Sequence, residues 1–218
     1  MSQSHTDGAL EYYGQLKQDL ECLEYFKNKK NGFFVDIGAG NGKDLSNTYL
    51  LEKNFGWKGI CVEPLKDPFT LCKNLRTNSQ CYETCVYDKV GEVEFSYIPG
   101  SSGESYMYSG ISEEIKHHQS RVNSDSHKVF LPATTLTNLL DESNAPQIPS
   151  LIDFLSIDTE GSEAKILGAL DHSKYKFRYI TVEHNYVPQQ RSDIRIVLQK
   201  HGYKFLKENQ WDDIYVLI

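Results

Sequence analysis

The stretch that decides the fold reads Phe33-Phe34-Val35-Asp36-Ile37-Gly38-Ala39-Gly40-Asn41-Gly42. Apart from Asp36, its first five residues are aromatic or β-branched, which is typical of a strand buried on both faces of a parallel sheet. Three glycines then alternate with other residues, and residues 43–52 are predicted to form a helix. A strand, a glycine turn and a helix in this order open a nucleotide-binding βαβ unit, because residues without a Cβ let a ligand lie against the backbone.

The spacing of the glycines distinguishes two kinds of ligand. A dinucleotide fingerprint needs G-x-G-x-x-G, with a pyrophosphate at the N-terminus of the helix. Here the pattern is G-x-G-x-G, and the carboxylate of Asp36 would repel a pyrophosphate but attract an ammonium group. S-adenosylmethionine has no phosphate and carries both an ammonium and a sulfonium, so it is favoured over NAD. The residues of this stretch expected to bind it are Asp36, Gly38, Gly40, Asn41 and Gly42.

A second acid supports a nucleoside site. Residues 56–62 are predicted to form the next buried strand, which ends at Glu63 and Pro64. A carboxylate at that strand end can accept hydrogen bonds from both hydroxyls of a ribose. With the glycine turn upstream, we expect Glu63 and Pro64 to contact the cofactor.

Polar residues follow the glycine turn, and they have two interpretations. Asn47 and Thr48 are ordinary residues for the start of a helix. They are equally suited to meet the carboxylate of a bound amino-acid moiety, because a helix N-terminus favours anions. Both interpretations stay open, and both residues are kept as candidate cofactor ligands.

The composition predicts one soluble α/β domain over residues 1–218. Hydrophobic residues make up 39% of the 218 residues, so a packed core is expected. The 23 Lys and Arg against 30 Asp and Glu give a net charge of −7, and no nucleic acid is expected as a partner. No signal peptide or membrane-length apolar run is present. The five cysteines contain no C-x-x-C pair, which favours reduced thiols, Cys61 as a core residue, and a cytoplasmic location.

The outer parts of the chain are expected to cover and close the sheet. Residues 1–30 should contribute an N-terminal helix, from Gly8 to Lys30, and residues 64–77 another helix. Residues 79–87 are predicted to form the third strand, so that Tyr87 lies near the adenine of the cofactor. Residues 93–98 alternate in polarity as a further strand does.

Residues 99–127 are predicted to form an insertion that covers the substrate. The segment is long and rich in Ser, Gly and Tyr, as binding loops and lids are. Its candidates for contact with a polar substrate are Tyr106, Tyr108, His117, His118 and Arg121.

The second half of the chain places acids at two more strand ends. Residues 151–158 are predicted to form the fourth strand, followed by Glu160, and residues 177–183 the fifth, followed by His184. Ligands of open α/β sheets bind beyond the carboxyl ends of the strands. Asp158 and Glu160 are therefore expected to face the same crevice as Asp36. Two closing strands, at 203–206 and 214–218, are expected on either side of a polar turn that holds Asp212 and Asp213.

Taken together, the motifs resemble the FkbM family of S-adenosylmethionine-dependent methyltransferases. The resemblance is carried by residues 34–42, 46–52, 56–64, 154–163 and 182–185 and by Gly202-Tyr203, and its most specific part is Asp158-Thr159-Glu160-Gly161. It implies an α/β fold of the class I methyltransferase, Rossmann-like kind: a mostly parallel seven-stranded sheet with helices on both faces and an antiparallel last strand. It also implies transfer to oxygen, with sugar hydroxyls and hydroxyls of secondary metabolites as known acceptors. Residues 100–128 match poorly.

A hydroxyl acceptor has a high pKa, so a base or a metal ion helps to remove its proton. The candidates are Asp158, Glu160, Glu183 and His184, with His117 and His118 as second choices. Asp158 is also a candidate cofactor ligand, through a hydrogen bond to the ammonium group. Alternatively, Asp158, Glu183 and His184 hold a divalent cation, Mg²⁺ or Mn²⁺. The function predicted is O-methylation of a sugar hydroxyl of a glycan or glycoconjugate. The alternatives are methylation of a small secondary metabolite, or a non-catalytic nucleoside-binding module.

Overall fold

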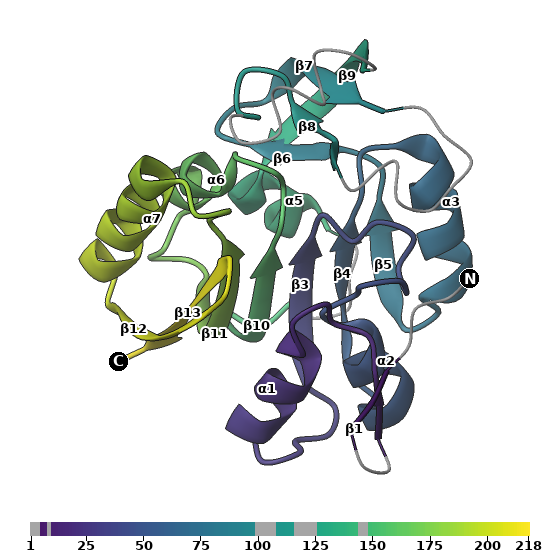
Figure 1. The fold of residues 1–218 in the computed structure, drawn as a ribbon, viewed down its shortest axis with the longest axis vertical. Coiled ribbons are helices and arrows are strands. Elements are labelled where there is room, and N and C mark those ends of the chain that lie inside the picture. The colour runs from purple at the N-terminus through teal and green to yellow at the C-terminus, as the bar shows by residue number, and fades with distance from the viewer. Residues whose placement is uncertain (1–4, 8–9, 99–107, 116–125, 144–147) are drawn as a thin grey trace.

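The protein is built around one seven-stranded sheet (Figure 1). The computed structural model describes residues 5–7, 10–98, 108–115, 126–143 and 148–218. The order of strands across the sheet is β12-β13-β11-β10-β3-β4-β5. Their bounds are β3 Phe33–Ile37, β4 Lys58–Val62, β5 Ser79–Tyr82, β10 Leu151–Ile157, β11 Lys176–Glu183, β12 Tyr203–Asn209 and β13 Asp212–Leu217.

The four central strands run parallel, and their side chains are buried on both faces. In β3, residues 34–37 are all buried, and the strand pairs in parallel with β4 and β10. The register places Asp36 beside Ser156 of β10 and Cys61 of β4. The carboxyl ends of these strands consequently meet at one edge of the sheet, which is where ligands of open α/β sheets bind.

Helices cover both faces of this sheet, as predicted (Figure 1). One apolar cluster packs residues of α5, α6 and α7 against one face, and a second packs residues of α1, α2 and α3 against the other. The helices are α1 Gln18–Tyr25, α2 Tyr49–Phe55, α3 Lys66–Leu75, α5 Leu136–Glu142, α6 Glu163–Ala169 and α7 Pro188–Lys200.

The last strand is antiparallel, also as predicted. β13 lies between β11 and β12 and runs antiparallel to both. This is the arrangement of the class I methyltransferase fold. One detail of the prediction was wrong, because Asp212 and Asp213 do not form a turn. The turn is made by Gln210, with φ 55°, and Trp211, so both acids belong to β13 and are buried.

A second sheet was not predicted as such. The segment 79–87 is not one strand: β5 ends at Tyr82, and Cys85–Tyr87 forms β6, which leaves the main sheet and pairs in parallel with β9. The four strands of this second sheet follow the order β6-β9-β7-β8. Here β7 Gly91–Tyr97 confirms the alternating strand, β8 is Gly110–Ile111, and β9 is His127–Thr135.

Two helices are shorter than the sequence suggested. The N-terminal segment starts with the antiparallel strands β1 His5–Asp7 and β2 Leu10–Tyr12, and α1 begins only at Gln18. The helix α2 begins at Tyr49 rather than Lys43. The Asn41 side-chain oxygen accepts hydrogen bonds from the backbone N–H groups of Lys43 and Asp44, which holds this segment as a loop.

Of the predicted substrate insertion, 99–127, the structure describes residues 108–115, 126 and 127. Tyr106, His117, His118 and Arg121 lie outside the described residues. Within the described ranges, no helix combines the length and the apolar character needed to cross a bilayer.

Candidate active site

A cavity lies where the carboxyl ends of β3, β4, β10 and β11 face the second sheet. The main sheet contributes the glycine turn and a set of acids, and the second sheet contributes mostly apolar side chains. The lining residues that matter below are Gln15, Gln18, Asp36, Gly38, Gly40, Asp44, Ser46, Asn47, Glu63, Pro64, Cys85, Val86, Phe95, Ser109, Ile111, Asp158, Glu160 and Glu183.

The glycine turn brings two strands together beneath the cavity. Gly38 has φ +90°, and a Cβ built on it would lie 1.9 Å from the carbonyl oxygen of Asp158. The backbone N–H of Asp158 donates to the carbonyl of Ile37 at 3.0 Å. Only glycine satisfies both the left-handed backbone and this close approach. The turn is therefore packed directly on the segment that carries Asp158 and Glu160.

Glu63 holds the other side of the turn. One of its carboxylate oxygens accepts a hydrogen bond from the N–H of Gly40 at 3.0 Å, and the other from the N–H of Leu65 at 2.9 Å. Burial raises the pKa of Glu63 to about 7, although the two backbone donors oppose this shift. The carboxylate is thus fixed in orientation, and each oxygen keeps a lone pair for a further donor in the cavity.

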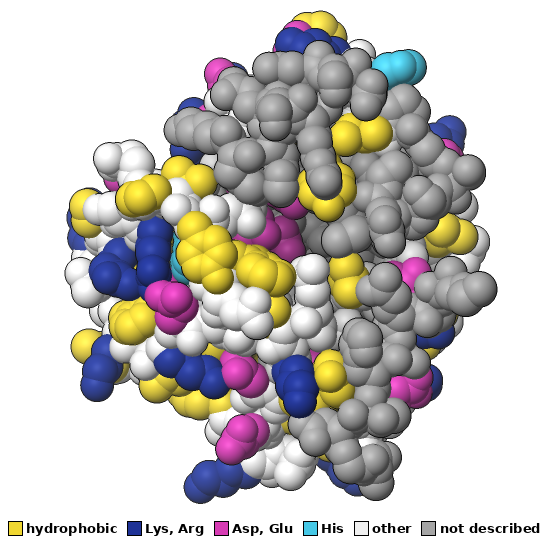
Figure 2. All heavy atoms as spheres, in the orientation of Figure 1, with side chains coloured by type: hydrophobic (Ala, Val, Ile, Leu, Met, Phe, Trp, Pro, Cys, Tyr) yellow, Lys and Arg dark blue, Asp and Glu magenta, His cyan; other side chains and the backbone are white. Residues whose placement is uncertain are grey.

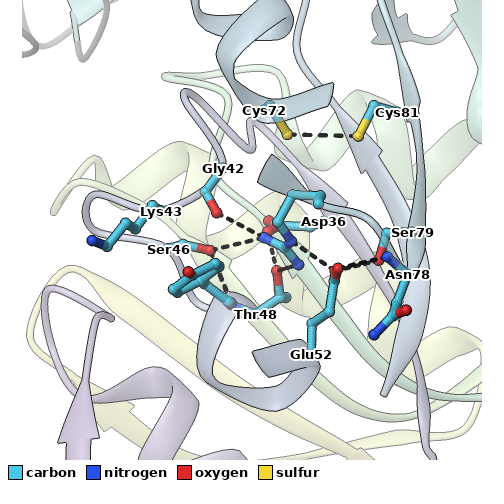
Figure 3. A network of polar contacts seen from close by, with 12 residues as sticks. Asp36, Gly42, Lys43, Ser46, Thr48, Glu52, Cys72, Asn78, Ser79 and Cys81 are labelled. Atoms are coloured by element: carbon cyan, nitrogen blue, oxygen red, sulfur yellow. Dashed lines mark hydrogen bonds and ion pairs between the residues drawn. The ribbon is translucent and has the colours of Figure 1, made fainter. Parts of the chain in front are cut away.

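Asp36 is held from behind by a buried network (Figure 3). The hydroxyl of Thr48 donates to Asp36 at 2.6 Å, and the guanidinium of Arg76 donates to Thr48 at 2.7 Å. Arg76 also donates to the carbonyl of Gly42 and forms an ion pair with Glu52 at 2.8 Å. Burial raises the pKa of Asp36, and the charge of Arg76 works against that shift.

The same network fixes the position of Thr48, which the sequence predicted as a cofactor ligand. Thr48 is fully buried and lies behind Asp36, whereas Asn47 lines the cavity. Asn41 and Gly42, also predicted as cofactor ligands, are not among the lining residues; Asn41 orders the loop, and the carbonyl of Gly42 accepts from Arg76. The sequence did not identify Arg76 or Glu52 as supports of the site. A charged residue in or beside a helix gives no sign in the sequence that its side chain is buried.

Four buried polar atoms of the cavity wall have no hydrogen-bond partner among the described residues. They belong to four side chains from three segments of the chain. Three of them are acceptors, and one is a hydroxyl. Buried polar groups are normally paired, so such atoms indicate a ligand. The acceptors suit an ammonium group, and the wall therefore fits S-adenosylmethionine. The atoms are Asp44 Oδ1, Asn47 Oδ1, Ser109 Oγ and Glu183 Oε2.

Three carboxyl groups converge at one side of the cavity. Oxygen atoms of Asp158, Glu160 and Glu183 all lie within 4.8 Å of one another. Burial and the neighbouring acids raise the pKa of Asp158 and Glu183, and burial with the charge of Glu163 raises the pKa of Glu160 to about 8. Figure 2 shows acidic side chains at the centre of one face of the molecule. The geometry of the cluster offers oxygen atoms to a hydroxyl or a cation.

His184 does not reach this cluster. Successive residues of a strand point to opposite sides, so Glu183 faces the cavity and His184 faces away from it. The imidazole is completely buried, with Nε2 3.5 Å from Asp213 and Nδ1 accepting from the N–H of Tyr186. The structure therefore does not bring the predicted base and metal ligand His184 together with Asp158 and Glu183.

Tyr87 is likewise directed away from the cavity lining. Its hydroxyl bonds to Glu113 and Glu114 and accepts from Lys165. The cavity is lined instead by the residues just before it, Cys85 and Val86. The reason is that β6 belongs to the second sheet, which sequence reasoning did not anticipate.

Several residues of the wall come from segments without any chemical signal in the sequence. Gln15 and Gln18 enter from the N-terminal segment, and Gln18 donates to Asp212 at 2.9 Å. Phe95 and Ile111 enter from β7 and β8. Only the long-range pairing of these segments brings them to the strand ends.

Comparison with known proteins agrees with this arrangement. The family model described as the methyltransferase FkbM domain matches residues 36–205. Methyltransferase sdnD of Sordaria araneosa is 23% identical over 211 residues, covering 87% of this chain and 81% of that protein.

The solved structures to which the chain is similar include the following two. The precorrin-6y C5,15-methyltransferase of Geobacter metallireducens has 11% identity and a TM-score of 0.48, covering 91% of this chain and 84% of that one. The N-terminal domain of human METTL16 has 12% identity and a TM-score of 0.48, covering 98% and 71%. Because the family model spans most of its length, the chain belongs to the FkbM methyltransferase family and is an S-adenosylmethionine-dependent methyltransferase.

Proposed function

We propose that this enzyme methylates a hydroxyl group of a small polar acceptor, with a sugar hydroxyl of a glycan or glycoconjugate as the acceptor class. The observation that carries the proposal is the convergence of Asp158, Glu160 and Glu183 within 4.8 Å at the cavity wall. Carboxylates are the usual partners of neighbouring hydroxyl groups, since each offers two acceptor oxygens. Gln15 and Gln18, which also line the cavity, add amide groups of the kind that sugars bind.

In this proposal the cofactor lies across the glycine turn. Asp36, Asp44 and Asn47 present acceptors to its ammonium group, and Thr48 acts by orienting Asp36. Glu63, fixed by Gly40 and Leu65, accepts from the ribose hydroxyls. The adenine is enclosed by the apolar part of the wall, formed by Pro64, Cys85, Val86, Phe95 and Ile111.

The bound cofactor supplies an electrophilic methyl group, and the chain supplies position and a proton acceptor. An ionised carboxylate of the cluster would take the proton of the acceptor hydroxyl as the hydroxyl oxygen bonds to the methyl carbon and the bond from that carbon to sulfur breaks. The raised pKa of Glu160, about 8, matches this role, because a base works best when its pKa lies near the working pH. Glu183 keeps one oxygen without a hydrogen-bond partner among the described residues and is the best placed to meet the hydroxyl.

The test uses substitutions that keep the size of the side chain. Turnover is measured with a labelled methyl donor and a panel of sugars, glycosides and hydroxylated metabolites. We expect Asp158→Asn and Glu183→Gln each to lower kcat by about 100-fold or more, since general bases contribute about 10²–10⁴-fold. The matched control is Asp153→Asn, on the same strand but outside the cavity, where the carboxylate pairs with Lys29. Its kcat should stay within about twofold of the parent.

Two outcomes would change the proposal. Full turnover in both Asp158→Asn and Glu183→Gln would exclude these two acids as the base, and full turnover in Glu160→Gln as well would exclude the whole cluster. If the enzyme methylated apolar metabolites and no sugar, the proposed sugar acceptor would be wrong, and an apolar metabolite would be the acceptor instead. A parallel assay with EDTA, followed by Mg²⁺ or Mn²⁺, decides whether the carboxylates act through a divalent cation, whose preferred ligands are such oxygens.

A further inference from the structure

Three cysteines meet on the side of β4 that is covered by α3, away from the carboxylate cluster. They are Cys61 in β4, Cys72 in α3 and Cys81 in β5. Their three sulfur atoms all lie within 4.8 Å of one another. The sulfurs of Cys72 and Cys81 are separated by 3.7 Å, and Figure 3 shows these two side chains facing each other. Cys61 and Cys81 are direct neighbours in the parallel pairing of β4 and β5. The helix that connects these two strands thus places its own cysteine over the pair.

We propose that Cys61, Cys72 and Cys81 bind one soft d¹⁰ cation, of the class of Cu⁺ or Zn²⁺, through three thiolates. Soft thiolate ligands select such ions. A metal–sulfur distance of about 2.3 Å in tetrahedral geometry separates two ligand sulfurs by about 3.8 Å. The separation of Cys72 and Cys81, 3.7 Å, already meets this requirement. The third sulfur lies within 4.8 Å, so it needs to move by no more than about 1 Å.

The residues around the three cysteines form a largely buried site, which solvent reaches at Cys81. Cys61 and Cys72 are buried in the apolar cluster that includes Ala39, Leu50 and Leu51, whereas Cys81 is only partly buried. The accessible sulfur is thus the first to meet an incoming ion.

The chemistry of binding is balanced without an oxidant. Three S–H bonds break, three metal–sulfur bonds form, and three protons pass to the solvent. In the described part of the chain, no fourth His, Cys, Asp or Glu ligand atom joins the group within 4.8 Å. The site therefore offers a trigonal set to Cu⁺, or three of the four positions of Zn²⁺ with a water molecule as the fourth.

A bound ion would tie α3 to both strands beside it. Cys72 also touches the glycine turn, since a Cβ on Gly42 would lie 2.9 Å from its sulfur. Arg76, one helical turn after Cys72, donates to the carbonyl of Gly42. The ion would consequently stabilise the segment that carries Glu63 and the turn above it.

The experiment titrates the reduced enzyme with Cd²⁺ as a spectroscopic probe, and with Cu⁺ in competition with a chromophoric chelator. We expect one equivalent to bind with a thiolate-to-metal charge-transfer band and a rise in Tm. Each of Cys61→Ala, Cys72→Ala and Cys81→Ala should weaken binding by about tenfold or more. The matched controls Cys22→Ala and Cys85→Ala remove buried cysteines outside the group and should leave it unchanged. The band separates this site from the carboxylate cluster, whose oxygen ligands give none.

A measurement on the unchanged enzyme guards against variants that fail to fold. Bound metal should protect Cys81, the accessible member, from alkylation by iodoacetamide, as read by mass spectrometry. Absence of the charge-transfer band, equal weakening by Cys85→Ala, or unprotected Cys81 at saturating metal would each overturn the proposal.

Discussion

At the scale of single residues, the acid at the end of β4 combines a structural and a binding task. The Glu63 carboxylate accepts from the N–H groups of Gly40 and Leu65, and we assign it the ribose of the cofactor. In Glu63→Gln the amide NH₂ must face one of the two backbone donors. A lost bond to a charged acceptor costs about 1.5–3 kcal/mol. We therefore expect calorimetry to show S-adenosylhomocysteine binding about 10- to 100-fold more weakly, with Glu92→Gln, an exposed acid of β7, as the unaffected control. An unchanged Kd would remove Glu63 from the site.

The buried side chain of Arg76 leads to a prediction about the free energy of unfolding rather than about ligand binding. Its side chain is completely buried and pairs with Glu52 at 2.8 Å. Arg76→Met would leave that acid buried without its charge partner, which costs about 3–5 kcal/mol. Arg178→Met is the control, because Arg178 is half-exposed and lies 3.5 Å from Asp153, which keeps its ion pair with Lys29 when Arg178 is replaced. We expect this loss to be at most about 1 kcal/mol. Urea unfolding of the two variants measures the difference, and equal losses would show that the buried network does not hold α2 and α3 in place.

At the scale of elements, the turn after β3 can be compared with a second glycine of positive φ. The comparison measures the cost of steric contact apart from the cost of backbone strain. Gly38 and Gly202 both have positive φ, but a Cβ on Gly38 would lie 1.9 Å from a carbonyl oxygen, whereas one on Gly202 meets nothing within 4 Å. Gly202→Ala should therefore cost only about 1 kcal/mol. Gly38→Ala must displace the segment of Asp158, and we expect it to lose cofactor binding together with more than about 3 kcal/mol of unfolding free energy. Similar Tm values for the two variants would contradict the close packing of the turn.

The positions of the strands also show which features of the site can be predicted from the sequence. Asp36, Glu63, Asp158 and Glu183 were placed correctly at one edge of the sheet, because each ends a strongly apolar strand and parallel strands end together. The same alternation that points Glu183 into the cavity points His184 away from it. The prediction for His184 was wrong because it treated Glu183 and His184 as one group that faces the cavity together.

Other errors came from tertiary contacts. Nothing local separates β5 from β6, since the break exists only because β6 pairs with a strand more than forty residues later. The lining residues Phe95 and Ile111 arrive through the same second sheet. The loop before α2 had a readable signal, the Asn41 side chain that bonds to Lys43 and Asp44, but its effect on the helix start depends on the network below it.

At the scale of the whole molecule, the acids gathered at the strand ends make stability depend on pH. Burial raises the pKa of Asp212 to about 6, of Glu63 to about 7 and of Glu160 to about 8. A carboxyl group with a raised pKa binds more protons in the folded state than in the unfolded state, so stability is greatest below its unfolded pKa, near 4, and falls as pH rises through the folded value. The ligand-free enzyme should accordingly lose Tm steadily between pH 4.5 and about pH 8.

Removing one of these charges should flatten that decline. A pKa shift of one unit corresponds to about 1.4 kcal/mol. Glu160→Gln, whose amide oxygen can still accept from Asn185, is therefore expected to stabilise the ligand-free enzyme by about 1–3 kcal/mol at pH 8 and by almost nothing at pH 5. Differential scanning calorimetry at both pH values provides the measurement, with Glu92→Gln as the exposed control. A cationic cofactor neutralises the same cluster, so saturating S-adenosylmethionine should reduce the gain at pH 8. A gain that is equal at both pH values, or unaffected by the cofactor, would mean that Glu160 does not carry the buried charge that the catalytic proposal needs.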